Sequence, residues 1–175
     1  WDDEGSLERI AVRRGQYPDG RSDAKGIQPE GVGTGVFGNR EFAFVTAERA
    51  AFVAVYDIDG QKPRFVQLLP TGLRPEAALA IPARNLFVTA DEGDEGDGGI
   101  SIFEGVSGRW QGTFDRPLPE SASADVPWSA LSGFAADLSS PHRLFAVPDD
   151  ALPSDIYQID IAGTTPKVST PVHVT

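Results

Sequence analysis

The sequence predicts an all-β protein of the β-propeller type, with about three four-stranded blades and an additional N-terminal strand. Three observations carry this prediction. Short runs rich in Val, Ile, Phe and Tyr alternate with turns rich in Gly, Pro, Asn and Asp. Few windows space their apolar residues as a helix does. The strand pattern also recurs along the chain, and a repeat of about 40–50 residues with four short strands is typical of a propeller blade.

The predicted strands fall into three groups of four. The first group comprises residues 31–37, 41–46, 52–57 and 64–69, and the second comprises 76–81, 86–90, 100–104 and 109–114. The third comprises 131–135, 143–147, 156–160 and 167–174. Turn sequences such as Gly38-Asn39 and Asp59-Gly60 separate the strands.

The second strands of the three groups align over a five-residue segment that begins with Phe and ends with an acidic residue. The Phe residues are Phe44, Phe87 and Phe145, and the acidic residues are Glu48, Asp91 and Asp149. This recurrence favours equivalent blades, in which the acid accepts hydrogen bonds from N–H groups of the following turn. The alternative is an ordinary β-sandwich in which the alternation arose by chance.

The repeats divide a single propeller fragment, residues 1–175, into blades at approximately 29–72, 75–116 and 128–174. Residues 1–28 are expected to end a preceding blade, with its outer strand at 6–14, and to connect it to the first repeat. A Pro/Ser/Ala-rich connection at 117–127 lengthens the third repeat. Because propellers close with about four to eight blades, we expect the remainder of a parent chain or a second copy to complete the ring.

Composition excludes several classes of protein. The chain has 26 acidic and 15 basic side chains, a net charge of −11 and no Cys. Disulfide scaffolds, thiolate metal sites and Cys nucleophiles are therefore impossible, and an acidic chain is a poor partner for nucleic acid. No apolar run is long enough for a membrane span. The absence of Met at the start indicates a piece of a longer protein.

The strongest local feature is the acidic loop at residues 91–99, where five carboxylates and four glycines follow one another. Asp91, Asp94 and Asp97 recur at every third position. Ca²⁺ takes six to eight oxygen ligands on a flexible backbone, so these residues are the first candidate ligands. The alternative is a solvated acidic hairpin without an ion.

A second candidate metal site joins Glu30 and Glu76, at the starts of the first strands of two groups. First strands line the central channel of a propeller, so both carboxylates are expected to point toward it. There they could hold a divalent cation or share a proton, or alternatively satisfy backbone groups where blades meet. Ser132 occupies the corresponding place in the third group, which breaks the symmetry.

Basic residues near the N-terminus are candidates for binding phosphate. Arg21 and Lys25, with Arg13 and Arg14, could contact the phosphate groups of a substrate. They could equally pair with the abundant carboxylates. No Gly-x-Ser-x-Gly motif is present, so the sequence assigns no catalytic nucleophile.

Residues 17–26 followed by Pro29-Glu30-Gly31-Val32, together with 88–94, 128–133 and 154–160, resemble secreted bacterial propeller proteins of the phytase-like type. Members are described as "esterase-like activity of phytase" or choice-of-anchor I proteins. The resemblance implies a secreted or periplasmic, calcium-assisted phosphoesterase of the phytase or alkaline-phosphatase kind, acting on a small-molecule phosphoester. The alternative is a non-enzymatic extracellular propeller for binding or surface attachment. Members are much longer, so sites from their other blades have no counterpart here.

Overall fold

The computed structural model describes residues 4–94, 98–112, 119–123, 126–128, 131–148, 155–163, 165–169 and 171–173. The chain divides into two compact units. The first unit contains Arg21–Asp115, and the second combines Glu4–Gly20 with Arg116–Thr175.

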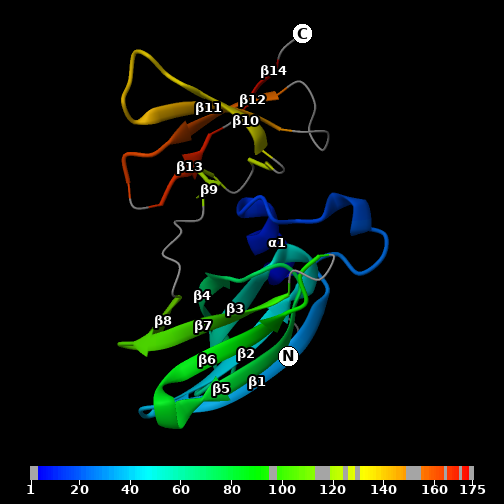
Figure 1. Cartoon of the computed structure of the whole chain (residues 1–175), viewed down its shortest axis with the longest axis vertical. Coiled ribbons are helices and arrows are strands. Elements are labelled where there is room, and N and C mark those ends of the chain that lie inside the picture. The colour runs from blue at the N-terminus through cyan, green and yellow to red at the C-terminus, as the bar shows by residue number, and fades with distance from the viewer. Residues whose placement is uncertain are drawn as a thin grey trace. The chain divides into compact units, whose positions relative to one another are not determined.

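The described residues of the first unit form two four-stranded antiparallel sheets (Figure 1). The first sheet has the order β1 (Pro29–Phe37), β2 (Arg40–Ala47), β3 (Phe52–Asp57) and β4 (Arg64–Pro70). The second has the order β5 (Pro75–Ile81), β6 (Leu86–Asp91), β7 (Gly99–Val106) and β8 (Arg109–Gly112). Each sheet is a simple meander of sequential strands, as in a propeller blade. The predicted all-β fold of blade-like sheets is confirmed.

An aromatic core joins the two sheets of this unit. The rings of Phe44 and Phe87 stack with centroids 4.0 Å apart, and both side chains are fully buried. The indole of Trp110 meets Phe44 edge-on at 4.9 Å. On the inner strands, a Cβ on Gly33 would lie 2.9 Å from the carbonyl oxygen of Ala78. The small residue at this position therefore lets β1 and β5 approach closely.

The recurring Phe residues do not occupy equivalent positions in the two sheets. Equivalent residues of a rotational repeat point the same way around the axis, but Phe44 and Phe87 point toward each other. The two sheets pair in the same register, because Gly33 pairs with Phe44 and its counterpart in the repeat, Leu79, pairs with Val88. Phe87, which pairs with Ala80, therefore lies one residue before the counterpart of Phe44. Successive side chains of a strand point to opposite faces, so an offset of one residue reverses the face.

The sheet of the second unit is less regular. Its path runs β10 (Leu131–Ala136), β11 (Arg143–Pro148), β12 (Asp155–Asp160), β13 (Lys167–Val168) and β9 (Glu120–Ser121), and β14 (Val172–His173) also pairs with β12. The strand predicted at 167–174 is therefore interrupted, and Pro171 lies in the break, where it cannot donate a backbone hydrogen bond. β9 lies inside the segment predicted as a connection, and it pairs with β13 in parallel.

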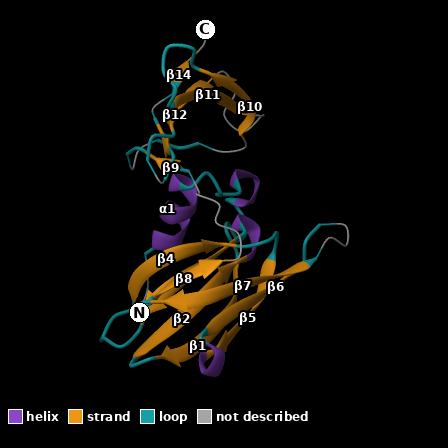
Figure 2. Cartoon of the chain, turned by 60° about the vertical axis from the view of Figure 1, so that its left-hand side comes forward, coloured by secondary structure: helices purple, strands orange, loops and turns teal. Residues whose placement is uncertain are grey.

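The N-terminal strand predicted at 6–14 is wrong, because this segment forms the helix α1 (Ser6–Arg13), seen in purple in Figure 2. The buried residues of α1 are Leu7 and Ala11, four positions apart, which is the spacing of one helical face. Glu8 in the first turn and Arg13 in the last turn also suit the helix dipole. The helix has only eight residues, which are too few for helical spacing of apolar residues to be recognised in the sequence.

The core of the second unit packs α1 and its following turn against the sheet. The indole Nε1 of Trp128 donates a hydrogen bond to the carbonyl oxygen of Arg13 at 3.2 Å. The hydroxyl of Ser121 is 3.1 Å from the same oxygen. On the sheet itself, Tyr157 is fully buried and donates its hydroxyl proton to the carbonyl oxygen of Pro127 at 3.0 Å.

Candidate carboxylate centre

The candidate site lies in the first unit, where the inner strands β1 and β5 begin. A Cβ on Gly31 of β1 would be only 2.3 Å from the carbonyl oxygen of Glu76 on β5. Glycine is therefore required at position 31, because any side chain would force the two strands apart. Their close approach places the beginnings of both strands, and hence the segments carrying Glu30 and Glu76, beside each other.

Three carboxylates converge here from separate segments. Among the described residues, one carboxylate oxygen each of Glu48, Glu76 and Glu92 lie within 4.8 Å of one another. Glu48 begins the short 3-10 helix η2 (Glu48–Ala50) after β2, Glu76 lies near the start of β5, and Glu92 follows β6. Glu48 is only 3 % exposed, whereas Glu76 and Glu92 are exposed. The cluster therefore has a buried base and an open side.

The buried base is held by Gln28. Its Nε2 donates to an oxygen of Glu48 and, at 2.6 Å, to Oε1 of Glu30. Its Oε1 accepts a hydrogen bond from Nη2 of Arg21 at 2.7 Å. Gln28 has a positive φ of 54°, an uncommon conformation for a side chain of this size. One amide thus links both glutamates to Arg21.

Backbone hydrogen bonds and ion pairs complete the arrangement around Glu48. The backbone N–H of Glu48 donates to the carbonyl oxygen of Gln28 at 3.1 Å, and that of Arg49 donates to Ile27 at 3.1 Å. Nη2 of Arg49 also lies 2.9 Å from Oε1 of Glu48. This pairing offsets part of the cost of burying a carboxylate.

Arg74 organises the open side of the cluster. Its guanidinium lies 3.6 Å from a carboxylate oxygen of Glu92 and 2.8 Å from one of Asp94. The backbone N–H of Glu92 donates to the carbonyl oxygen of Arg74 at 2.9 Å. On the same end of the sheet, Nζ of Lys25 lies 3.9 Å from Glu30. Cations and carboxylates therefore alternate around the centre.

The three aspartates of the acidic loop have different surroundings. Asp91 is 6 % exposed and accepts hydrogen bonds from Thr89 (2.7 Å), Ser101 (2.5 Å) and the backbone N–H of Gly72 (3.1 Å). These bonds use both of its oxygens and fasten β6 to β7 and to the preceding turn, which fits a structural role. Asp94 is exposed and pairs with Arg74. Asp97 lies outside the described residues.

The structure therefore assembles a site that overlaps only partly with the candidates from the sequence. Glu76 belongs to the cluster, and Glu30 is joined to it through Gln28. The sequence does not mark Glu48 or Glu92 as a metal ligand, although Glu48 is recognisable as the acid at the end of a second strand. Arg21 is linked to these carboxylates by its hydrogen bond to Gln28, and Lys25 by its ion pair with Glu30.

Comparison with known proteins supports a family resemblance for part of the chain. Residues 9–61 match the choice-of-anchor I domain, which is less than half of the chain. This matched segment includes Glu30 and Glu48, whereas Glu76 and Glu92 follow it. The match supports a β-rich domain of a secreted or cell-surface protein, and it does not extend to a phytase. None of the curated proteins matches the chain.

Two solved structures show a distant likeness. The first is hydrazine synthase from Kuenenia stuttgartiensis, at 14 % identity and a TM-score of 0.38, covering 85 % of this chain and 36 % of that one. The second is a functionally unknown protein from Desulfotomaculum acetoxidans, at 15 % identity and a TM-score of 0.39, covering 82 % of this chain and 42 % of that one. The chain thus spans less than half of either structure. Scores this low carry no argument about function.

The described part of the chain holds no helix with the length and apolar character required to cross a lipid bilayer.

Proposed function

We propose that this chain is part of an extracellular propeller-type protein whose carboxylate centre binds a divalent cation, Ca²⁺ in particular, for cation-dependent binding or surface attachment. The convergence of Glu48, Glu76 and Glu92 within 4.8 Å supports this most directly. Ca²⁺ favours carboxylate oxygens and tolerates irregular coordination, which suits ligands drawn from three separate segments. Close carboxylates otherwise repel one another, so a cation would stabilise their approach.

The test is thermal unfolding of the protein with Ca²⁺ and with a chelator. A ligand that binds only the folded state raises its stability by mass action, by about 2.7 kcal/mol at a hundred times Kd. Melting temperature is therefore expected to rise with Ca²⁺. Glu76→Gln should weaken Ca²⁺ binding by roughly tenfold or more in calorimetry, because it removes one charged ligand.

Glu104→Gln is the matched control, since Glu104 is an exposed carboxylate on β7 that is not part of the cluster. It should leave the calcium response unchanged. Identical melting curves with Ca²⁺ and chelator would overturn the proposal, as would equal effects of the two substitutions.

A second candidate function is calcium-assisted hydrolysis of a small phosphoester. The observation that favours it is the placement of Arg21, Lys25 and Arg74 beside the carboxylates. A bound cation neutralises phosphate charge and lowers the pKa of a bound water, while guanidinium groups pair with phosphate oxygens. Hydrolysis of p-nitrophenyl phosphate or phytate that requires Ca²⁺ and falls in Arg74→Gln would support it. Calcium binding without any hydrolysis would contradict the hydrolytic function and retain the binding function.

The exposed face of the second sheet supports the expectation of a further sheet. Leu79, Val88 and Ile102 lie side by side across β5, β6 and β7, and Leu79 and Ile102 are 58 % and 42 % exposed. In a propeller such a face packs against the next blade. The covering sheet would come from the remainder of a parent chain or from a second copy. Light scattering distinguishes these sources, because a second copy doubles the mass and Ile102→Glu should then restore the monomer.

A further inference from the structure

A pocket lies at the other end of the first unit, where the strands of both sheets turn back. It has a volume of about 360 Å³. It is bordered by the β1–β2 turn, by the residue after the 3-10 helix η3 (Pro82–Arg84) and by the β7–β8 turn. The side chains that matter for its chemistry are those of Phe37, Asn39, Arg40, Asn85, Ser107 and Trp110. β1 runs from the carboxylate centre to this pocket, so the two sites are at opposite ends of one strand.

Tight turns in left-handed conformations bring these side chains together. Asn85 has φ 54° and Ser107 has φ 51°, and neighbouring Gly38 and Gly108 also have positive φ. Asn85 is further positioned by its backbone, whose carbonyl oxygen accepts from Gly105 N–H at 2.9 Å. Positive φ at a non-glycine residue costs energy that the surrounding structure must offset, and such positions gather at functional sites. The rim residues Asn39 and Ser107 are exposed to solvent.

The wall of the pocket is aromatic and contains a buried donor. Trp110 is 3 % exposed and meets Phe37 and Phe42 edge-on at 5.4 and 4.5 Å. Its indole N–H is buried, and no acceptor for it exists among the described residues. Buried donors are nearly always hydrogen-bonded, so an unpaired one calls for an explanation. Because Trp110 lines the pocket, an oxygen-rich ligand there is a candidate acceptor.

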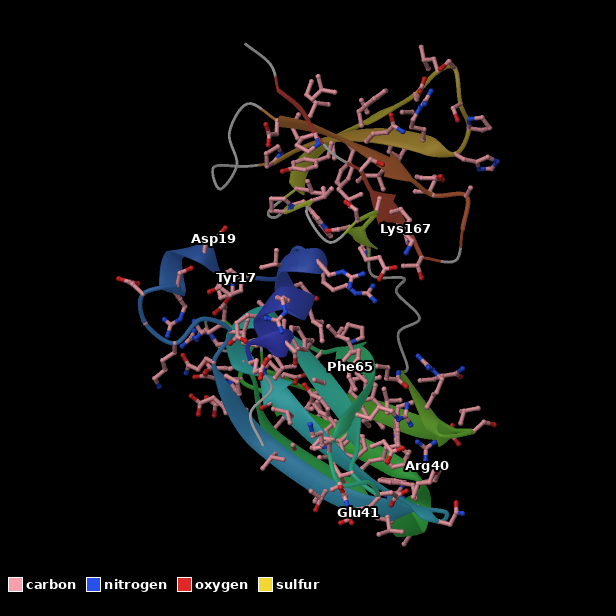
Figure 3. All side chains as sticks on the ribbon, turned by 180° about the vertical axis from the view of Figure 1, so that it is seen from behind. Tyr17, Asp19, Arg40, Glu41, Phe65 and Lys167 are labelled. Atoms are coloured by element: carbon pink, nitrogen blue, oxygen red, sulfur yellow. The ribbon has the colours of Figure 1, made fainter. Side chains whose placement is uncertain are left out.

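One cationic side chain, Arg40, belongs to the described lining of the pocket. Arg40 forms an ion pair with Asp57, and Arg64 lies 2.7 Å from the same carboxylate. Hydrogen bonds from Arg40 and from the backbone of Asp59 lower the pKa of Asp57 to about 2, so this carboxyl stays ionised at neutral pH. Arg64 is not part of the pocket lining, and the carboxylate of Asp59 accepts a hydrogen bond from the N–H of Glu41 beside Arg40, so Arg40 is the guanidinium group that a ligand in the pocket could contact. Figure 3 labels Arg40 at this end of the sheets.

We propose that this pocket binds a small sugar acid, with its carboxylate on Arg40 and its hydroxyl groups on the polar rim. A guanidinium matches a carboxylate with charge-assisted, often bidentate hydrogen bonds. The amide of Asn39 and the hydroxyl of Ser107 can each donate and accept, which matches sugar hydroxyl groups. Nδ2 of Asn85 already donates to the carbonyl oxygen of Gly105, so its second N–H is the one left for a ligand. The volume lies at the lower end of the range for small-molecule pockets, which suits a single sugar ring.

Calorimetric titration with glucuronate, glucose and acetate tests the ligand chemistry. The buffer contains a chelator, so that the outcome does not depend on the carboxylate centre. Glucuronate is expected to bind, glucose and acetate to bind at least tenfold more weakly. Acetate binding as tightly as glucuronate would overturn the sugar assignment, because the carboxylate alone would then be the ligand. No heat from glucuronate up to about 10 mM, a Kd weaker than is useful for recognition, would overturn the site.

Two variants locate the binding. Arg40→Lys keeps the charge but loses the planar guanidinium, and it should weaken glucuronate at least tenfold. Arg84→Lys, at an exposed arginine outside the pocket lining, is the matched control and should change binding less than twofold. Ser107→Gly removes one rim hydroxyl at a backbone conformation that glycine adopts freely, so it tests the rim without a folding cost. Equal binding by all three variants would overturn the proposal.

Discussion

The two units of this protein contain strands of similar composition but differ in how they bury them. In the first unit, two meanders stack face to face and enclose an aromatic cluster that includes Phe44, Phe87 and Trp110. In the second unit, one sheet packs against a short helix and coil, with Tyr157 and Trp128 at its core. Three of its strands, β9, β13 and β14, have only two residues each. The length of a strand thus depends on the surface against which it packs, because the β-propensity of its residues alone does not determine where a strand ends.

The largest effect is expected from Phe87→Ala in the first unit. This side chain is fully buried and stacks on Phe44. Truncating a buried Phe costs about 3–5 kcal/mol, since it removes apolar contacts and leaves a cavity. Urea unfolding followed by circular dichroism measures the change. Phe65→Ala, at a residue that is 39 % exposed, should cost far less, and an equal cost for the two would contradict the proposed core.

A smaller loss is expected from Gly15→Ala in the second unit. Gly15 has φ +64°, and a Cβ there would lie 2.6 Å from the ring of Trp128. Left-handed backbone disfavours alanine by about 1–2 kcal/mol, and overpacking adds about 1–3 kcal/mol. The measurement is the unfolding transition followed by circular dichroism. Gly20→Ala is the control, because nothing lies within 4 Å of its Cβ position. The contact would be refuted if both variants unfolded alike.

The subtlest test is the alkaline titration of the second unit. Burial, reinforced by the charge of Asp155, raises the pKa of Tyr157 to about 12. The unfolded state ionises near the ordinary value of about 10. This group therefore favours the folded state fully below pH 10, and its contribution is lost as the pH rises toward 12. Tyrosinate absorbance should show one late titration that disappears in Tyr157→Phe. A complete titration near pH 10 in the folded protein would contradict it.

Much of the first unit could be predicted from the sequence. Strands at 52–57 and 64–69 agree with β3 and β4, and the turn at Gly38-Asn39 lies between β1 and β2. Alternating side chains and turn residues are local signals, so they can be read one segment at a time. The sequence does not predict the helix α1, because its apolar face has only two buried residues, Leu7 and Ala11. The sequence does not predict the break before β14 either, because the break depends on how this segment pairs with β12.

The candidate site could be predicted only in part from the sequence. Glu76 was recognisable as an acid at the start of an inner strand, and Glu92 lies in an evident acidic run. Their meeting with Glu48 depends on Gly31 allowing β1 to approach β5, a contact between residues far apart in sequence. The sequence gives no sign of the role of Gln28, because that role comes from a backbone conformation and from a hydrogen bond to Glu48, twenty residues away, as well as to the nearby Glu30.

The sequence by itself determined the all-β character, the approximate strands, the surplus of negative charge and the presence of carboxylates at strand ends. Only the tertiary structure decided which carboxylates meet, which face each Phe presents and where a pocket opens. The physical reason is the separation along the chain over which each interaction acts. Propensity, alternation and turn chemistry act over a few neighbouring residues, whereas register and packing depend on distant segments. A one-residue offset along a strand, such as that between Phe44 and Phe87, places the side chain on the opposite face without altering the local pattern.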